Sequence, residues 1–260
     1  MWRIPYSSIV SSRPFKFLVG PDKIEYTIHG ALVAHQSRAL HTLVYGGLKE
    51  SQEQCVEWAE VDPDTFIRFA QYLYTGDYAA AATEWLVQSA QATIEESPEQ
   101  TSDNQQLSNQ ATAPEEPRPH RHPESPFIWR SNHDPAESLG PLFLSHAKLY
   151  VLADCYGIEG LTQISLYKLH NQLRIFTLHP ERITDVLDLV EFSYEHGPAE
   201  LQDLVSSFAS SHLDMLWKTE EFKELFGRFP DLAMSLMDIQ MNKLLSWHRW
   251  RFPTWVRQSD

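Results

Sequence analysis

The stretch Phe66 to Tyr78 constrains the fold most, because it holds a helix with its own start and stop signals. Asp62 is a favourable N-cap residue, Pro63 suits the first helical position, and Gly76 ends the run. The sequence therefore predicts a capped helix with one apolar face. The residues that recur at helical spacing on that face are Phe66, Phe69, Ala70 and Leu73.

Short strands are expected before this helix. Apolar and polar residues alternate over 15–19 and again over 24–28, with Gly20-Pro21-Asp22 between the two runs, which predicts a hairpin with one buried face. Ser37 can cap a short second helix, and residues 55–58 are favourable for a third strand.

Residues 79–140 interrupt this pattern, although the region around Trp85 could prolong a helix. Six prolines lie within 95–126, where seven acidic residues and two arginines give a local charge of about −5. So little apolar surface cannot offset the conformational entropy of ordering the chain, so we expect a disordered insert. Closing a loop of about 60 residues instead of about 6 costs only roughly 2 kcal/mol, which one domain can tolerate.

Helical patterns resume after the insert. Two neighbouring helices are expected within 141–174, the first with a wide apolar stripe that ends at Gly157. The sequence then predicts an all-helical extension over 175–246 and a basic, aromatic tail over 247–260. The four apolar patterns of the extension cover 183–194, 201–208, 222–229 and 236–244.

Composition excludes several functional classes. The chain has 260 residues and a net charge of −14, so nucleic acid is not an expected partner, because phosphate binding needs clustered Lys and Arg. Cys55 and Cys155 imply no disulfide framework, and we expect both to be reduced core residues of a cytoplasmic or nuclear protein. The chain has neither a signal-peptide pattern nor an apolar window long enough to span a bilayer, so we expect no membrane association.

Nothing in the sequence indicates an enzyme. It has no Gly-x-Gly-x-x-Gly motif, no phosphate-binding loop and no Gly-x-Ser-x-Gly elbow. His29, His35 and His41 are spaced by six, which does not place them on one helix face, so we predict no metal site. We expect His29 to be buried and hydrogen-bonded at a strand-to-helix corner. His120 and His122 have no Cys or carboxylate partners at ligand spacing. No catalytic residue, cofactor or metal is predicted.

Several short motifs occur in a fixed order along the chain. They are Phe15 to Gly20, the spacing of His29, Leu32, Val33 and Ser37, Gly47 to Ser51, Thr65-Phe66, Tyr74 to Tyr78, and His146 to Tyr156. Together they resemble a BTB/POZ domain of the filamentous-fungal type over residues 13–78 and 141–174. The resemblance implies an α+β fold, a small three-stranded sheet with helical hairpins, that dimerises and recruits protein partners without catalysis. Residues 1–12 would be a mobile leader without a helix.

The resemblance also indicates a partner-binding loop. Members that act as substrate adaptors of cullin-RING ubiquitin ligases carry a hydrophobic-x-Glu pattern before the third strand, which Leu48-Lys49-Glu50 matches. An apolar anchor beside a carboxylate combines a buried contact with a directional hydrogen bond. The alternative is that Glu50 and Ser51 merely cap the turn into the strand. The candidate partner-binding residues are Leu48, Glu50, Ser51 and Tyr78.

The tail offers a second candidate region. Its Trp250 and Trp255 are interleaved with arginines, a pattern that can stack on bases or lie at a membrane interface. Three arginines are few for either role. We expect the tryptophans to pack back on the helical extension, with a partner-docking peptide as the alternative.

Two functional classes remain open from the sequence. The first is an interaction module that forms homodimers or joins a substrate to a cullin scaffold. The second is a nuclear, transcription-associated BTB protein, which would require a DNA-binding domain or a Lys-rich localisation signal, and neither is visible. A self-associating scaffold cannot be separated from the first class by sequence.

Overall fold

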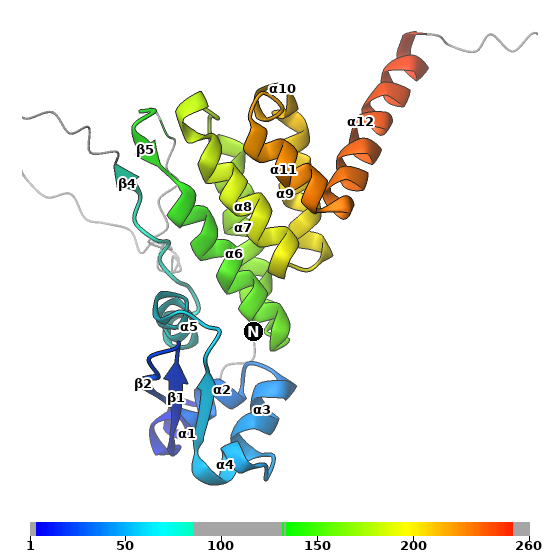
Figure 1. Cartoon of the computed structure of the whole chain (residues 1–260). Helices are drawn as coiled ribbons and strands as arrows, with labels where there is room; N and C mark the ends of the chain where they lie inside the picture. The colour runs from blue at the N-terminus through cyan, green and yellow to red at the C-terminus, as the bar shows by residue number, and fades with distance from the viewer. Residues whose placement is uncertain (1–3, 86–131, 133, 252–260) are drawn as a thin grey trace, which may run out of the picture.

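A small mixed sheet forms the N-terminal lobe (Figure 1). The computed structural model describes residues 4–85, 132 and 134–251, without the side chains of Trp85 and 247–251. The central strand β1 pairs antiparallel with β2 and parallel with β3, so the predicted hairpin, the third strand and the α+β class are confirmed. The strands are β1 (Pro14–Val19), β2 (Ile24–His29) and β3 (Cys55–Trp58).

Short capped helices connect and cover these strands. The Ser37 side chain accepts a hydrogen bond from the amide of Leu40, and Asp62 accepts one from the amide of Thr65 at 2.9 Å, as their N-cap positions predict. The helix predicted from Phe66 onward is therefore confirmed. The helices of this lobe are α1 (Tyr6–Ser11), α2 (Gly30–Ala34), α3 (Arg38–Tyr45), α4 (Lys49–Glu53) and α5 (Pro63–Thr75).

Helix α1 was not expected, because the leader shows too short an apolar pattern to predict one. Ile9 packs against the core of the lobe. The hydroxyl of Ser12 donates to the carbonyl of Ile9 at 2.8 Å and accepts from the amide of Ala31 at 3.2 Å, which fastens the end of α1 to α2. Tertiary contacts therefore stabilise a helix that local propensity alone would not.

Both ends of the predicted insert contain regular structure. The strands β4 (Glu84–Trp85) and β5 (Glu137–Ser138) form an antiparallel pair, so the helix suggested around Trp85 is wrong at this residue. The buried carboxylate of Asp185 accepts hydrogen bonds from the Ser138 hydroxyl at 2.9 Å and the Leu139 amide at 2.8 Å. These bonds hold the chain around β5 against the helices, an arrangement that composition could not predict.

The C-terminal part is helical throughout, as expected (Figure 1). The four apolar patterns of the extension correspond to α8, α9, α11 and α12, whereas η1 and α10 are too short to show a period. Helix α12 continues to Arg251, so the predicted tail begins as helix. The elements are α6 (Gly140–Cys155), α7 (Glu159–Ile175), η1 (Pro180–Arg182), α8 (Ile183–His196), α9 (Ala199–Ser211), α10 (Leu213–Leu216), α11 (Glu220–Arg228) and α12 (Pro230–Arg251).

Helix α6 belongs to two hydrophobic cores. Ten of its sixteen residues are buried, and they cover most of the helix circumference, leaving one half-buried to exposed edge along the helix. Leu149 and Leu152 pack with the sheet lobe, and Phe143 and Tyr150 pack with the helical lobe. The same helical core joins α7 to α8, so packing does not separate residues 141–174 from the extension.

Three side chains lie in different environments from those predicted. Cys155 is exposed, so its assignment as a core residue is wrong, and Cys55 is half-buried; both are free thiols. His29 is half-buried rather than buried, and its Nδ1 lies 2.9 Å from the hydroxyl of Tyr74. The hydrogen bond expected at this corner is therefore present.

Replacing the cap of α5 should weaken the lobe. The Asp62→Ala substitution removes the acceptor for the Thr65 amide, and we expect it to lower the free energy of unfolding by about 1 kcal/mol in urea denaturation. Asp64→Ala, at an exposed position of the same first turn, is the control and should change stability by less than about 0.5 kcal/mol. Equal losses in the two variants would contradict the capping role.

Candidate partner-binding surface

An exposed leucine lies at the tip between α3 and α4. Helix α3 ends at Tyr45, and Gly47 takes a left-handed backbone conformation at φ +78° that turns the chain toward α4. Leu48, the N-cap residue of α4, is 56% exposed, and Tyr45 is exposed as well. Leu48, which the sequence makes a candidate partner-binding residue, is thus exposed to solvent.

The two polar residues of the predicted loop behave differently. The hydroxyl of Ser51 donates to the carbonyl of Leu48 at 2.7 Å, so Ser51 stabilises the turn, as the alternative interpretation predicts. Glu50 lies in the first turn of α4 and makes no capping hydrogen bond. Within the described part of the chain, its carboxylate forms no ion pair or hydrogen bond, so capping does not account for Glu50. Leu48 and Glu50 remain together as candidates.

Tyr78 does not belong to this surface. Its side chain is fully buried, and its hydroxyl lies 2.8 Å from Nδ1 of His146 on α6. The Nζ of Lys168 on α7 donates to the Tyr78 carbonyl at 2.6 Å and lies 4.2 Å from the centre of the ring. The prediction that Tyr78 binds a partner is therefore corrected: the residue joins the end of α5 to α6 and α7.

Lys168 is the charge at the centre of this connection. The side chain is only 4% exposed and forms an ion pair with Asp77, next to Tyr78 in the chain. Burial lowers the pKa of Lys168, and the hydrogen bond that its ammonium group donates to the Asp77 carboxylate opposes that shift. A buried ammonium group needs such partners, and removing it would take the ion pair from the Asp77 carboxylate, which would keep the hydrogen bond from the Tyr78 amide.

His146 is the neutral member of the same cluster. Burial away from water, with the positive charges of Lys168 and Arg68 added, lowers the pKa of His146 to about 3. The imidazole is therefore uncharged at neutral pH and can share one hydrogen with the Tyr78 hydroxyl. The cluster is a structural joint in which the charges are compensated.

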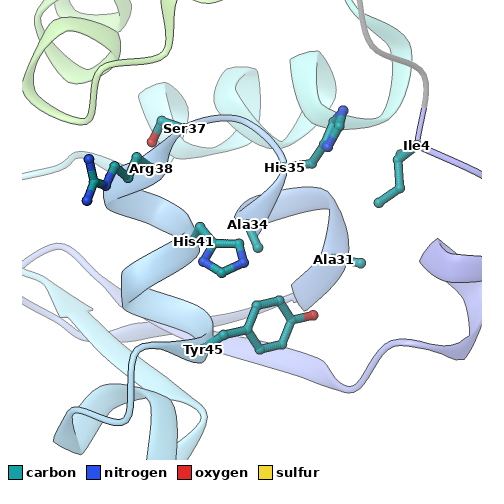
Figure 2. A pocket seen from close by; sticks show the side chains of 8 residues that line it. All are labelled: Ile4, Ala31, Ala34, His35, Ser37, Arg38, His41 and Tyr45. Atoms are coloured by element: carbon teal, nitrogen blue, oxygen red, sulfur yellow. The ribbon is translucent and has the colours of Figure 1, made fainter.

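A shallow hollow of about 540 Å³ lies on another side of α3 (Figure 2). His41 and Tyr45 stand next to each other there, with ring centres 5.4 Å apart, and Arg38 and His35 lie on either side of them. Residue spacing along α3 would have revealed this face, because positions 38, 41 and 45 recur every three or four residues. The spacing of the histidines alone does not indicate this face.

The hollow combines an apolar wall with polar groups. Its apolar wall comes from Ala31, Ala34 and Ile4, and its polar groups are two imidazoles, a guanidinium, a phenol and the capping hydroxyl of Ser37. His29 does not join it, since that ring meets Tyr74. In the range of residues that the structure describes, no group of three His, Cys, Asp or Glu side chains could hold a metal ion.

The tail candidates are outside the range in which side chains are described. Trp250 belongs to the last turn of α12 by its backbone, and Trp255 lies beyond the described residues. Their predicted packing on the extension therefore stays a prediction.

Comparison with known proteins adds no relative. No protein-family model matches the chain, and no curated protein matches it. The BTB/POZ resemblance consequently remains a prediction from sequence motifs. Among the described helices, none has both the length and the apolar character needed to cross a bilayer.

The contribution of the buried Lys168 to stability can be compared with that of the more exposed Lys148. We expect Lys168→Met to lower the free energy of unfolding by about 3 kcal/mol, because a largely buried ion pair with Asp77 and the hydrogen bond to the Tyr78 carbonyl are both lost. Lys148→Met removes an exposed ion pair with Asp62, 3.2 Å long, and should cost less than about 1 kcal/mol. If urea denaturation gave similar losses of unfolding free energy for the two variants, the buried Lys168 would not be the stabilising charge described here.

The depressed pKa of His146 makes stability fall in acid. Below a pH of about 6.5 the unfolded state binds a proton at this residue that the folded state excludes until about pH 3. The free energy of unfolding is therefore not reduced by His146 above pH 6.5, and it decreases as the pH falls below that value. At pH 5 the loss should be about 2 kcal/mol relative to pH 7.

Comparing the wild type with His146→Asn isolates this effect, since asparagine can keep a polar atom near the position of Nδ1. The wild type should lose about 2 kcal/mol more than the variant between pH 7 and pH 5, measured by urea denaturation at each pH. Parallel pH profiles for the two proteins would show that His146 does not titrate as described.

Proposed function

We propose that this chain is a non-enzymatic protein-interaction module of the BTB/POZ type. The observation that carries the proposal is the exposed Leu48, which a glycine turn and the Ser51 hydrogen bond hold at the tip of the lobe beside Glu50. An exposed leucine held in a defined backbone conformation loses little entropy on binding, which suits a small hot spot. The proposed partner is a cullin scaffold, and the proposed role is that of a substrate adaptor.

Self-association is the second proposed activity. Helix α1 exposes Tyr6 and Val10, which are 79% and 60% accessible and one helical turn apart. Large apolar side chains that share one face of a helix favour burial against another surface. A homodimer formed through α1 would leave the Leu48 tip on a different helix, so the two activities are compatible.

The scaffold proposal is tested by calorimetry with the full chain and a cullin N-terminal domain. We expect micromolar or tighter binding by the wild type. The Leu48→Ala, Glu50→Ala double variant should bind at least about tenfold more weakly, a loss of about 1.4 kcal/mol, because it lacks both the apolar anchor and the carboxylate. Circular dichroism would establish that the double variant is folded.

Ile67→Ala provides a matched control, since Ile67 is a similarly exposed aliphatic residue on α5. It should leave the affinity unchanged. An absence of binding by the wild type, or equal binding by the wild type and the double variant, would overturn the adaptor proposal. Sedimentation equilibrium of the chain alone tests self-association independently of cullin binding, because a homodimer forms without the cullin.

A further inference from the structure

The last helix, α12, packs on the protein through only one of its faces. Leu232 and Leu236 are buried in the helical core. Further along, Gln240 donates a hydrogen bond to the Ser210 carbonyl at 2.9 Å, and Lys243 donates one to the Ser210 hydroxyl at 3.1 Å. Figure 1 shows the helix rising away from the other helices toward its C-terminal end.

The opposite face of α12 is apolar and exposed. Its five side chains are between 55% and 60% accessible, and three of them are methionines of a chain that has only five. At about 100° per residue, the centre of this stripe lies about 140° around the helix from the face that contacts the core. We call it the methionine face: Met234, Met237, Met241, Leu244 and Leu245.

The spacing of this face selects a helix as its occupant. Met234, Met237, Met241 and Leu244 follow steps of three, four and three residues, which is the seam by which one helix packs along another. From Met234 to Leu245 the stripe is about 16 Å long, the length of about three helical turns. Methionine side chains are flexible and fit varied apolar surfaces, so the seam is suited to helices of differing sequence.

The charges beside the stripe select a basic occupant. Asp231 and Asp238 lie along one flank, about 70° to 90° from its centre. The cation of this part of the helix, Lys243, is on the side that contacts Ser210. The whole chain carries a net charge of −14, which adds long-range attraction for a positively charged segment.

A second copy of the chain fits this surface less well. Two copies would bring together molecules that each carry −14. An antiparallel pairing that sets Met237 against Met241 of the other copy would also place the two Asp238 carboxylates near each other on one flank. Like charges at such a position destabilise the pairing.

We propose that the methionine face of α12 is a docking site for an amphipathic helix of another protein, with Lys or Arg beside its apolar stripe. The site is separate from the Leu48 tip and does not depend on the cullin proposal. It would give the module a second partner surface, on the helical lobe.

The test uses a labelled helix-forming peptide of leucine and lysine, titrated with the full chain by fluorescence anisotropy. We expect micromolar binding that weakens at raised ionic strength. Met237→Ser with Met241→Ser should weaken it at least about tenfold, and Asp231→Asn with Asp238→Asn should weaken it about threefold and reduce its salt dependence. All four positions lie on exposed parts of the helix, so these variants should fold.

Three controls make the outcome decisive. A peptide with glutamate in place of lysine should not bind, Ile67→Ser should bind the lysine peptide like the wild type, and Leu48→Ala should do the same. Equal binding of the two peptides, or unchanged binding by the methionine variant, would overturn the proposal. A dimer in sedimentation equilibrium that the methionine variant loses would also overturn it, since a second copy would then occupy the face.

Discussion

The burial of α6 between two cores is the constraint on which the rest of this structure depends. Its buried residues face both lobes, so each lobe needs the helix to complete its core. Leu149 on one side and Phe143 on the other are both fully buried. The sheet lobe and the helical lobe are therefore stabilised by the same sixteen residues.

The buried Lys168 gives this arrangement a specific geometry. Apolar packing alone is tolerant of small shifts, whereas an ammonium group that must meet the Asp77 carboxylate and the Tyr78 carbonyl has few acceptable positions. Gly76, in a left-handed conformation at φ +77°, ends α5 and directs these two residues toward α7. Asp77 and Tyr78 of the Tyr74 to Tyr78 motif are thus explained by folding, whereas Leu48 of the Gly47 to Ser51 motif faces solvent.

Local signals in the sequence predicted the helices and strands better than they predicted the tertiary contacts of individual side chains. The cap at Asp62, the alternation in β1 and the helical periods from 183 onward depend on neighbouring residues, so they could be predicted from the chain itself. The burial of Tyr78 depends on Lys168, ninety positions away, and no local pattern encodes that contact.

Periodicity also misled at the surface. It assigns Met237 and Met241 to an apolar face, but it cannot tell whether another element covers that face, and none of the described residues does so. The same limit applies to Cys155, which ends a buried helix on its exposed side. Leu48, a candidate from the sequence, is exposed, and the spacing along α3 indicates the face that holds His41 and Tyr45. That this face borders a hollow follows only from the placement of α2 beside α3.

The central claim is that the segments before and after the gap fold as one unit around α6 and Lys168. Native-state hydrogen exchange tests it most directly, by comparing the amides of Phe17 and Val19 in β1 with those of Leu149 and Tyr150 in α6. The account predicts one common free energy of opening for both sets, equal to that of global unfolding. A clearly lower opening free energy for β1 than for α6 would contradict it, because the sheet lobe would then unfold without the helix that completes its core.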